Sequence, residues 1–211
     1  MLFDYAISAF VTIFVVVDPI AMAPTFLAVT DDMPRVARKS VALRASVIAG
    51  IILIGTALIG NRLLLLFGIS LHAFRIAGGL LLFWIAAEMV FGVRSRHEGE
   101  AAEQAMEERV RNVAAFPLAI PLLAGPGAIA ATMLLAGRAG ASWTLLGVLL
   151  VIEALVAASC LITFLLAERI SRFLGVTGNI VLSRLLGVLL AALAVQYVVD
   201  GIHAAVTAIT G

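Results

Sequence analysis

"FPLAIPLLAGPGAIAATMLL", residues 116–135, is an uncharged segment that is long enough to cross a lipid bilayer. A membrane-spanning helix needs about 20 predominantly apolar residues. Three prolines and two glycines nevertheless fall within this stretch: Pro117, Pro121, Gly125, Pro126 and Gly127. Proline lacks a backbone donor and costs about 3 kcal/mol inside a helix. The segment is therefore predicted to be a spanning helix that is interrupted at its centre.

The composition of the whole chain is that of a membrane protein. Of its 211 residues, 63% are hydrophobic and 13% are charged, and the mean hydropathy is +1.16. Soluble domains contain about a quarter charged residues. Short strands of alternating polarity, as in an outer-membrane barrel, are absent from the sequence. We therefore expect an all-α integral membrane protein that forms a single membrane domain over residues 1–211, with no nucleic-acid partner.

Charged clusters and turn residues divide the chain into six predicted spans, at about 6–28, 41–60, 70–91, 113–135, 144–166 and 180–206. The long polar stretch at about 92–112 is predicted to be a linker. The connections on one side carry ten basic residues: Arg35, Arg38, Lys39, Arg44, Arg94, Arg96, Arg109, Arg111, Arg169 and Arg172. The other side carries only Arg62 and Arg138. The positive-inside rule places the first group, and the linker, in the cytoplasm and both termini outside.

The interrupted segment has a counterpart near the start of the chain. "DPIAMAPTFLAVT" (18–30) and "IPLLAGPGAIAAT" (120–132) share the pattern P-x4-P-x5-T at an offset of 102 residues. "FRIAGGLLL" (74–82) and "SRLLGVLLA" (183–191) also share an Arg followed three residues later by Gly. Each half, about 1–91 and about 113–211, contains three spans, so the second half enters the membrane from the opposite side. The sequence thus predicts two inverted three-helix repeats, an architecture common among secondary transporters.

The paired interruptions are the predicted substrate site, because interrupted helices of the two repeats meet near the midplane in such folds. A new half-helix starting at each second proline presents free N–H groups and a positive dipole end to an anion. Gly125 and Gly127 permit a ligand to approach the main chain closely. The candidate substrate-binding residues are Asp18, Pro19, Pro24, Thr25, Thr30, Pro121, Gly125, Pro126, Gly127 and Thr132. The alternative interpretation is a pair of kinked helices that pack tightly and bind nothing.

Ionisable residues inside the spans are the candidates for ion coupling or ion pairing: Asp18, Glu88, Glu153, Arg75 and Arg184. A carboxylate in the membrane is costly and usually functional or paired. Asp18 either binds a cation, a proton or an ammonium group, or caps the second half-helix. Glu88 either takes part in coupling or approaches the cytoplasmic interface. The two arginines either reach the headgroups or pair with one of the acids.

The two proline motifs, in a six-span chain of just over 200 residues, closely resemble the MarC family of bacterial inner-membrane proteins. The resemblance covers essentially the whole chain, and "PLAIPLLAGPGAI" is specific to that family. Many members carry Asn where this chain has Asp18, which indicates a need for a polar group rather than a charge. The family is grouped with SnatA-like small neutral amino-acid transporters, so the resemblance implies glycine- or alanine-like substrates.

The leading hypothesis is accordingly a secondary transporter of zwitterionic small amino acids, coupled to H⁺ or Na⁺, in the bacterial inner membrane. The absence of nucleotide, metal and catalytic motifs argues against an enzyme, a cofactor or a metal site. An exporter of other metabolites or drugs is one alternative. A non-transporting membrane scaffold is another. The sequence leaves the oligomeric state open, including a homo-oligomer.

Overall fold

The computed structural model describes residues 2–30, 33–92 and 114–210, and the described residues contain helices and no strands. The helices in chain order are α1 (Leu2–Val17), α2 (Met22–Val29), α3 (Arg35–Leu66), α4 (Leu71–Phe91), η1 (Ala114–Leu123), α6 (Pro126–Ala139), α7 (Trp143–Leu165) and α8 (Ala167–Thr210). Of these, η1 is a π-helix. The predicted linker at about 92–112 falls almost entirely outside the described residues.

Local sequence signals explain where the long helices begin and end. Ser70 and Ser142 precede α4 and α7, and each hydroxyl accepts a hydrogen bond from a backbone amide three residues ahead. Such N-caps satisfy a donor that the helix itself leaves unpaired. Gly92 ends α4 with φ at 76°, a left-handed conformation that glycine adopts without strain.

Four of the described helices are long and apolar enough to cross a membrane, and counting the bent pair of α1 and α2 as one span gives five. The predicted spans at 41–60, 70–91 and 144–166 lie within or closely match α3, α4 and α7. The predicted span at 180–206 is part of α8, which begins earlier, at Ala167, and changes direction at Gly175. The span predicted at 113–135 is divided between η1 and α6, both shorter than 18 residues, so six spans are not established.

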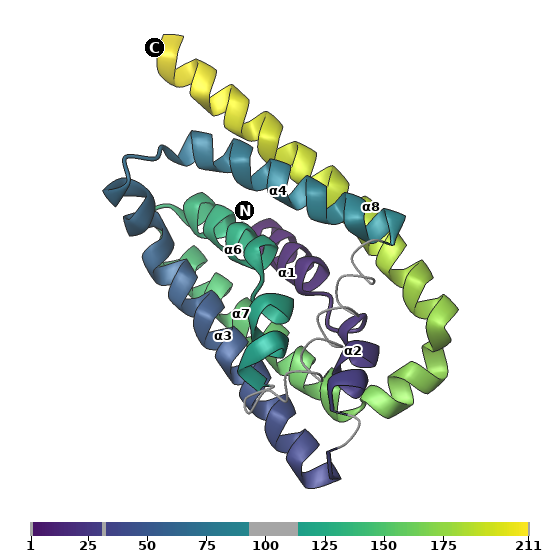
Figure 1. Ribbon diagram of the computed structural model, residues 1–211. Coiled ribbons are helices and arrows are strands. Elements are labelled where there is room, and N and C mark those ends of the chain that lie inside the picture. The colour runs from purple at the N-terminus through teal and green to yellow at the C-terminus, as the bar shows by residue number, and fades with distance from the viewer. Residues whose placement is uncertain (1, 31–32, 93–113, 211) are drawn as a thin grey trace.

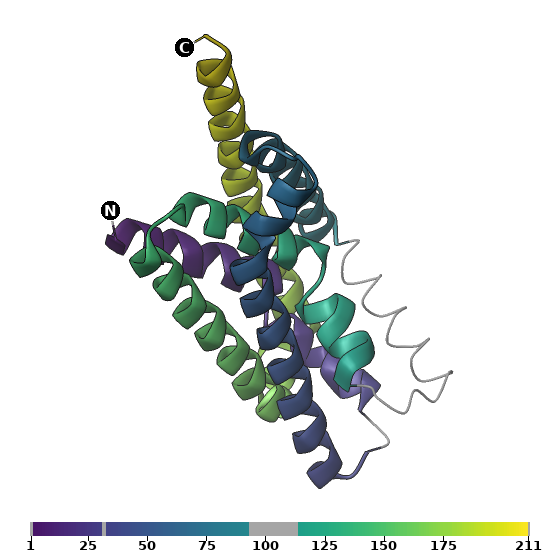
Figure 2. The same cartoon turned by 90° about the vertical axis from the view of Figure 1, so that its left-hand side faces the viewer.

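The long helices surround the interrupted ones. In Figures 1 and 2, α3 runs beside α7 in the opposite direction, and α4 likewise runs antiparallel to α8. Between these pairs lie α1 and α6, with fully buried residues such as Ile13 and Leu134. The outer faces expose large apolar side chains, among them Ile51, Trp84 and Val151. An apolar exterior of this kind is suited to contact with lipid.

Small residues bring α3 and α7 close together. Gly50 of α3 is buried, and a Cβ built on it would lie 3.2 Å from the Cβ of Ala157 in α7. Ser46 and Ala42, one and two turns earlier on the same face, are also buried. Small residues at such spacing let helix backbones approach in a membrane, where packing rather than hydrophobic exclusion drives association.

The connections gather at two ends of the molecule. At one end Arg38, near the start of α3, pairs with Glu168 at the start of α8 at 3.3 Å. At the other end Asn61, late in α3, donates its side-chain amide to the carbonyl oxygen of Ala136 in α6 at 3.4 Å. The basic residues at the starts of α3 and α8 thus lie at the first end. This division agrees with the charge asymmetry of the sequence.

Candidate functional site

The first interruption is a turn at Asp18, between α1 and α2. Asp18 has φ at 47°, a left-handed conformation in which Asp and Asn are enriched among residues with side chains. Its Oδ1 accepts a hydrogen bond from the Ala21 amide at 3.3 Å. The N-cap of α2 is Ala21 itself, so Asp18 lies just before the capping position considered from the sequence. Pro24 lies in the first turn of α2, where its missing donor has no intrahelical acceptor to lose.

The second carboxylate oxygen of Asp18 faces α8. The Ser183 hydroxyl donates a hydrogen bond to Oδ2 at 3.2 Å. Asp18 is 1% exposed and Ser183 is also buried, so this bond forms in a low-dielectric interior. The bond ties the first interruption to the last helix, and Ser183 was not singled out from the sequence although it precedes Arg184 in the repeated motif.

The second interruption lies between η1 and α6. Gly125 is the N-cap of α6 and Pro126 occupies its first turn, as predicted for the start of a half-helix. A Cβ built on Gly125 would lie 2.3 Å from the carbonyl oxygen of Pro121. Glycine is therefore required here by the fold of the turn itself.

Gly127 is also a point of close approach, and the approaching group is protein. A Cβ on Gly127 would lie 2.2 Å from Cδ1 of Ile85 and 3.4 Å from Cγ1 of Val16. The first turn of α6 therefore packs against both α4 and α1. The sequence predicts that a ligand approaches the main chain at Gly127. On this side of Gly127, the side chain of Ile85 occupies that space.

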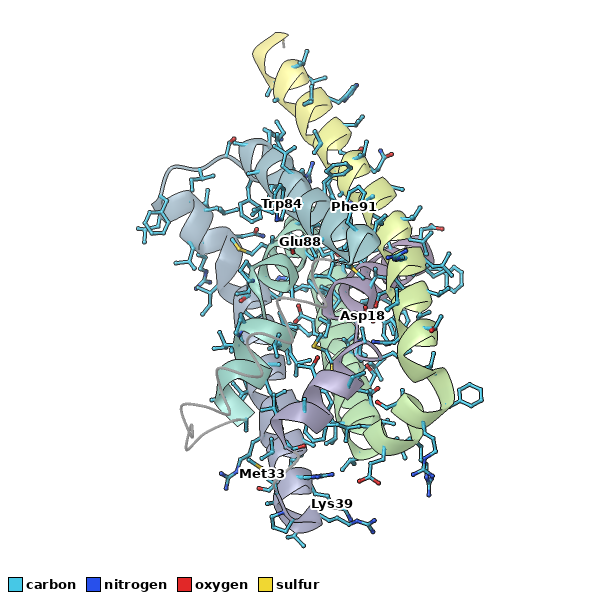
Figure 3. The ribbon with its side chains drawn as sticks, turned by 45° about the vertical axis from the view of Figure 1, so that its right-hand side comes forward. Asp18, Met33, Lys39, Trp84, Glu88 and Phe91 are labelled. Carbon is cyan, nitrogen blue, oxygen red and sulfur yellow. The ribbon has the colours of Figure 1, made fainter. Side chains whose placement is uncertain are left out.

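A cavity of about 160 Å³ opens beside this turn. It is lined by residues 121–123 and 125–128 of the second interruption, and by Val16, Ile85 and Glu88. The Glu88 carboxylate accepts a hydrogen bond from Nε1 of Trp84 at 2.9 Å, and Figure 3 shows both side chains on α4. The cavity therefore brings together the positive end of the α6 dipole and an acidic side chain.

Glu153 forms a second, separate polar position, midway along α7. Its side chain is fully buried, and neither carboxylate oxygen has a hydrogen-bond partner among the described residues. Thr132 of α6 is equally buried and lies near enough to interact with the carboxylate, although outside hydrogen-bond geometry. An unpartnered acid at this depth is costly, which makes it a candidate for function.

Comparison with known proteins identifies the family. Residues 3–206 match the family described as MarC family integral membrane protein. The chain belongs to the MarC family. The resemblance inferred from the proline motifs is thereby confirmed at the level of the family, and with it an integral, multi-pass membrane protein. No solved structure matches the chain.

Relatives of this MarC-family chain match it over nearly its full length. A UPF0056 membrane protein of Methanocaldococcus jannaschii is 39% identical over 206 residues, which cover 96% of this chain and 98% of the relative. The UPF0056 membrane protein YhcE of Escherichia coli is 36% identical over 205 residues, covering 95% and 94%. YvbG of Bacillus subtilis is 32% identical over 206 residues, covering 96% of each. These names place the relatives in membranes and assign them no substrate.

The remaining candidates of this MarC-family chain lie outside the cavity. The buried Thr30 hydroxyl donates a hydrogen bond to the carbonyl oxygen of Phe26 in its own helix at 2.7 Å. Thr25 is half-buried. Arg75 lies beside Gly201 and the exposed Arg184 lies near Gly92, both across the α4–α8 contact. In the described part of the chain, neither arginine forms an ion pair with Asp18, Glu88 or Glu153.

The structure thus distributes the predicted site over three places. The cavity unites Glu88 with the residues of the second interruption. Asp18 is held by Ser183, and Glu153 lies beside Thr132. The sequence missed Ser183 and Ile85, whose contacts run between helices, and Trp84, which contacts Glu88 within α4. Only the i,i+4 spacing of Trp84 and Glu88 was a readable signal.

Proposed function

We propose that this chain is a secondary transporter of small neutral amino acids of the glycine and alanine type, coupled to H⁺ or Na⁺. The observation that carries the proposal is the cavity at the second interruption. The proposed location of the protein is the bacterial inner membrane, with both termini on the outer side. The proposal agrees with membership of the MarC family and with the positive-inside distribution of basic residues.

A zwitterionic amino acid needs an electropositive group and an electronegative group close together. The amides of Gly127 and Ala128 lie in the first turn of α6, where backbone donors lack intrahelical acceptors and suit a carboxylate. Glu88 lines the same cavity and suits an ammonium group. The volume of about 160 Å³ and the apolar contacts from Val16 and Ile85 favour a substrate with a small side chain.

Glu153 is the proposed coupling group. It is fully buried and its oxygens have no hydrogen-bond partner in the described residues, so its charge must be neutralised by a proton or by a bound cation. Thr132, its neighbour on α6, lies about one helical turn after Ala128, which lines the cavity. A change in the protonation or cation binding of Glu153 can therefore reach the substrate cavity through α6.

The inverted repeat is part of the proposal and explains how the cavity is opened to either side. Arg75 contacts Gly201, and Arg184 lies near Gly92. The offset is 109 residues in each case, from 75 to 184 and from 92 to 201, so the two contacts are related by exchange of α4 and α8. Contacts that pair in this way support a pseudo-two-fold relation between the halves, as in transporters built from inverted repeats.

Proteoliposomes containing the purified chain test the proposal. We expect exchange of labelled alanine and glycine across the bilayer, and uphill accumulation only with a gradient of H⁺ or Na⁺. Glu88→Gln should lower exchange by about tenfold or more, because it removes the charge facing the ammonium group. Asp200→Asn is the matched control, since Asp200 bonds to Gln196 on α8 and does not line the cavity. A wild-type chain that exchanges neither amino acid would refute the proposal.

Glu153→Gln separates coupling from substrate binding. Glutamine keeps the volume of the side chain but neither binds a proton nor neutralises a cation. We expect exchange of alanine to persist within about threefold while accumulation driven by the ion gradient is lost. Unchanged accumulation in Glu153→Gln would remove Glu153 from the mechanism and leave the substrate site unaffected.

A further inference from the structure

A second hollow, distinct from the substrate cavity, lies at the end of the molecule that gathers the basic connections. Its volume is about 450 Å³. It is formed where the start of α3 meets the corner between α7 and α8. Four basic side chains and one acidic side chain line it: Arg35, Arg38, Lys39, Arg169 and Glu168. We refer to it as the basic hollow.

The basic hollow has an apolar wall as well as a basic one. Phe26 of α2 and Phe164 of α7 stack with ring centroids 4.5 Å apart and planes within 10° of parallel. Leu165 and Leu166 continue this wall at the end of α7, with 50% and 39% of their surface exposed. Phe26 and Phe164 are buried, so the accessible apolar surface is that of Leu165 and Leu166, at the end of a helix that is apolar enough to span a membrane.

Glu168, the acidic residue that lines the basic hollow, forms an ion pair within the protein. Glu168 pairs with Arg38, whose Nε also donates to the carbonyl oxygen of Thr30 at 2.9 Å. These bonds hold Arg38 in place in the lining of the hollow. Arg35, Lys39 and Arg169 are exposed, and none of them has a hydrogen bond or an ion pair to another described residue. Asp31 and Asp32 precede this region in the sequence and lie outside the described residues.

We propose that the basic hollow is a binding site for an anionic phospholipid. The phosphate occupies the space between Arg35, Lys39 and Arg169, and an acyl chain lies against the exposed Leu165 and Leu166. Guanidinium and ammonium groups are strong partners of phosphate oxygens. Basic pockets between membrane helices recur as headgroup sites. This inference does not depend on the identity of the transported substrate.

Two features favour a lipid over the other anions that share its phosphate chemistry. A free phosphate ion gains nothing from the exposed Leu165 and Leu166. An acidic protein segment has to displace lipid from Leu165, at the end of a spanning helix. An amphiphile satisfies both walls at once, because its charged headgroup and its hydrocarbon chain are joined in the geometry that the hollow offers.

Native mass spectrometry of the purified full chain in detergent tests the site. The chain is mixed with phosphatidylglycerol or with phosphatidylcholine, and the retained lipid is counted. The lining variant carries Lys39→Gln and Arg169→Gln. The control variant carries Arg44→Gln and Arg172→Gln, which remove the same charge from exposed positions on the same two helices that do not line the hollow.

We expect phosphatidylglycerol to be retained in preference to phosphatidylcholine. The lining variant should bind phosphatidylglycerol about tenfold more weakly, while the control variant stays within about twofold of the wild type. Inorganic phosphate and glycerol phosphate, added in excess, should leave the retained lipid in place. Gel filtration of both variants confirms that their folding is comparable.

Three outcomes would overturn the inference. Equal loss in the lining and control variants would indicate a diffuse basic surface instead of a site. Equal retention of both lipids would mean that the headgroup is not recognised. Displacement of the lipid by inorganic phosphate at low excess would assign the hollow to a free anion.

Discussion

At the scale of single residues, Asp18 has a structural role that its position before a proline only partly revealed. Its left-handed backbone and its two side-chain hydrogen bonds are separate requirements. Asparagine meets both, because it tolerates this conformation and its amide offers an acceptor to Ala21 and a donor to the Ser183 hydroxyl. Local geometry therefore accepts Asn at this position without a requirement for charge.

Substitutions at Asp18 separate these requirements. Asp18→Asn should keep the stability of the chain within about 1 kcal/mol, since both bonds and the backbone conformation survive. Asp18→Gly should lose about 1 kcal/mol, because glycine accepts the conformation but not the bonds. Asp18→Ala should lose most, about 2 to 3 kcal/mol, because alanine resists a positive φ as well. Unfolding in detergent micelles measures the order, and an Ala variant as stable as the Asn variant would contradict it.

At the scale of elements, the two helix interruptions differ in their surroundings. The first closes on α8 through the Asp18–Ser183 bond, whereas the second leaves a cavity between η1, α6 and α4. The wall of that cavity depends on how tightly the first turn of α6 packs on Ile85. Gly127 is therefore as important for the position of α6 as for access to its backbone.

Gly127→Ala should destabilise the chain by about 1 to 3 kcal/mol, because the added Cβ overlaps Cδ1 of Ile85. Ile85→Val removes that one atom and alone should cost about 1 kcal/mol. The double variant should recover much of the loss, which gives a favourable coupling in a double-mutant cycle. Gly147→Ala is the control, because no atom lies within 4 Å of its built Cβ. Additive losses in the double variant would exclude the Ile85 contact as the cause.

The sequence was enough to predict the two helix interruptions, but not the residues of other helices that contact them. Pro126 and Gly125 act within one turn of chain, so residue type and spacing were enough to place the start of α6. The contact of Gly127 with Ile85 and the bond from Ser183 join helices far apart in the sequence. Such contacts depend on how whole helices pack, and one sequence carries no local signal for them. For the same reason, the sequence grouped Asp18 with the second interruption in one site, whereas in the structure Asp18 does not line the cavity.

At the scale of the whole molecule, the number of spans decides which end of the chain faces which compartment. If η1 and α6 together cross the membrane, the starts of α3 and α8 lie on the same side. Their contact through Arg38 and Glu168 places them at one end of the molecule. Ten of the twelve connecting basic residues then face the cytoplasm, in accordance with the positive-inside rule.

Cysteine labelling in cells tests this topology directly, because Cys160 is only 2% exposed and gives little background. The sites are exposed residues, Phe3, Lys39, Trp143 and Phe173, each replaced singly by cysteine. An impermeant maleimide should label the variants at positions 3 and 143 in intact spheroplasts, and those at 39 and 173 only after permeabilisation. If η1 and α6 turn back without crossing the membrane, position 173 is labelled in intact spheroplasts and position 143 only after permeabilisation. The labelling of positions 3 and 39 is then unchanged. That exchange would also place Arg169 and Arg172 outside, against the positive-inside rule, and would exclude the inverted repeat on which the alternating opening of the cavity depends.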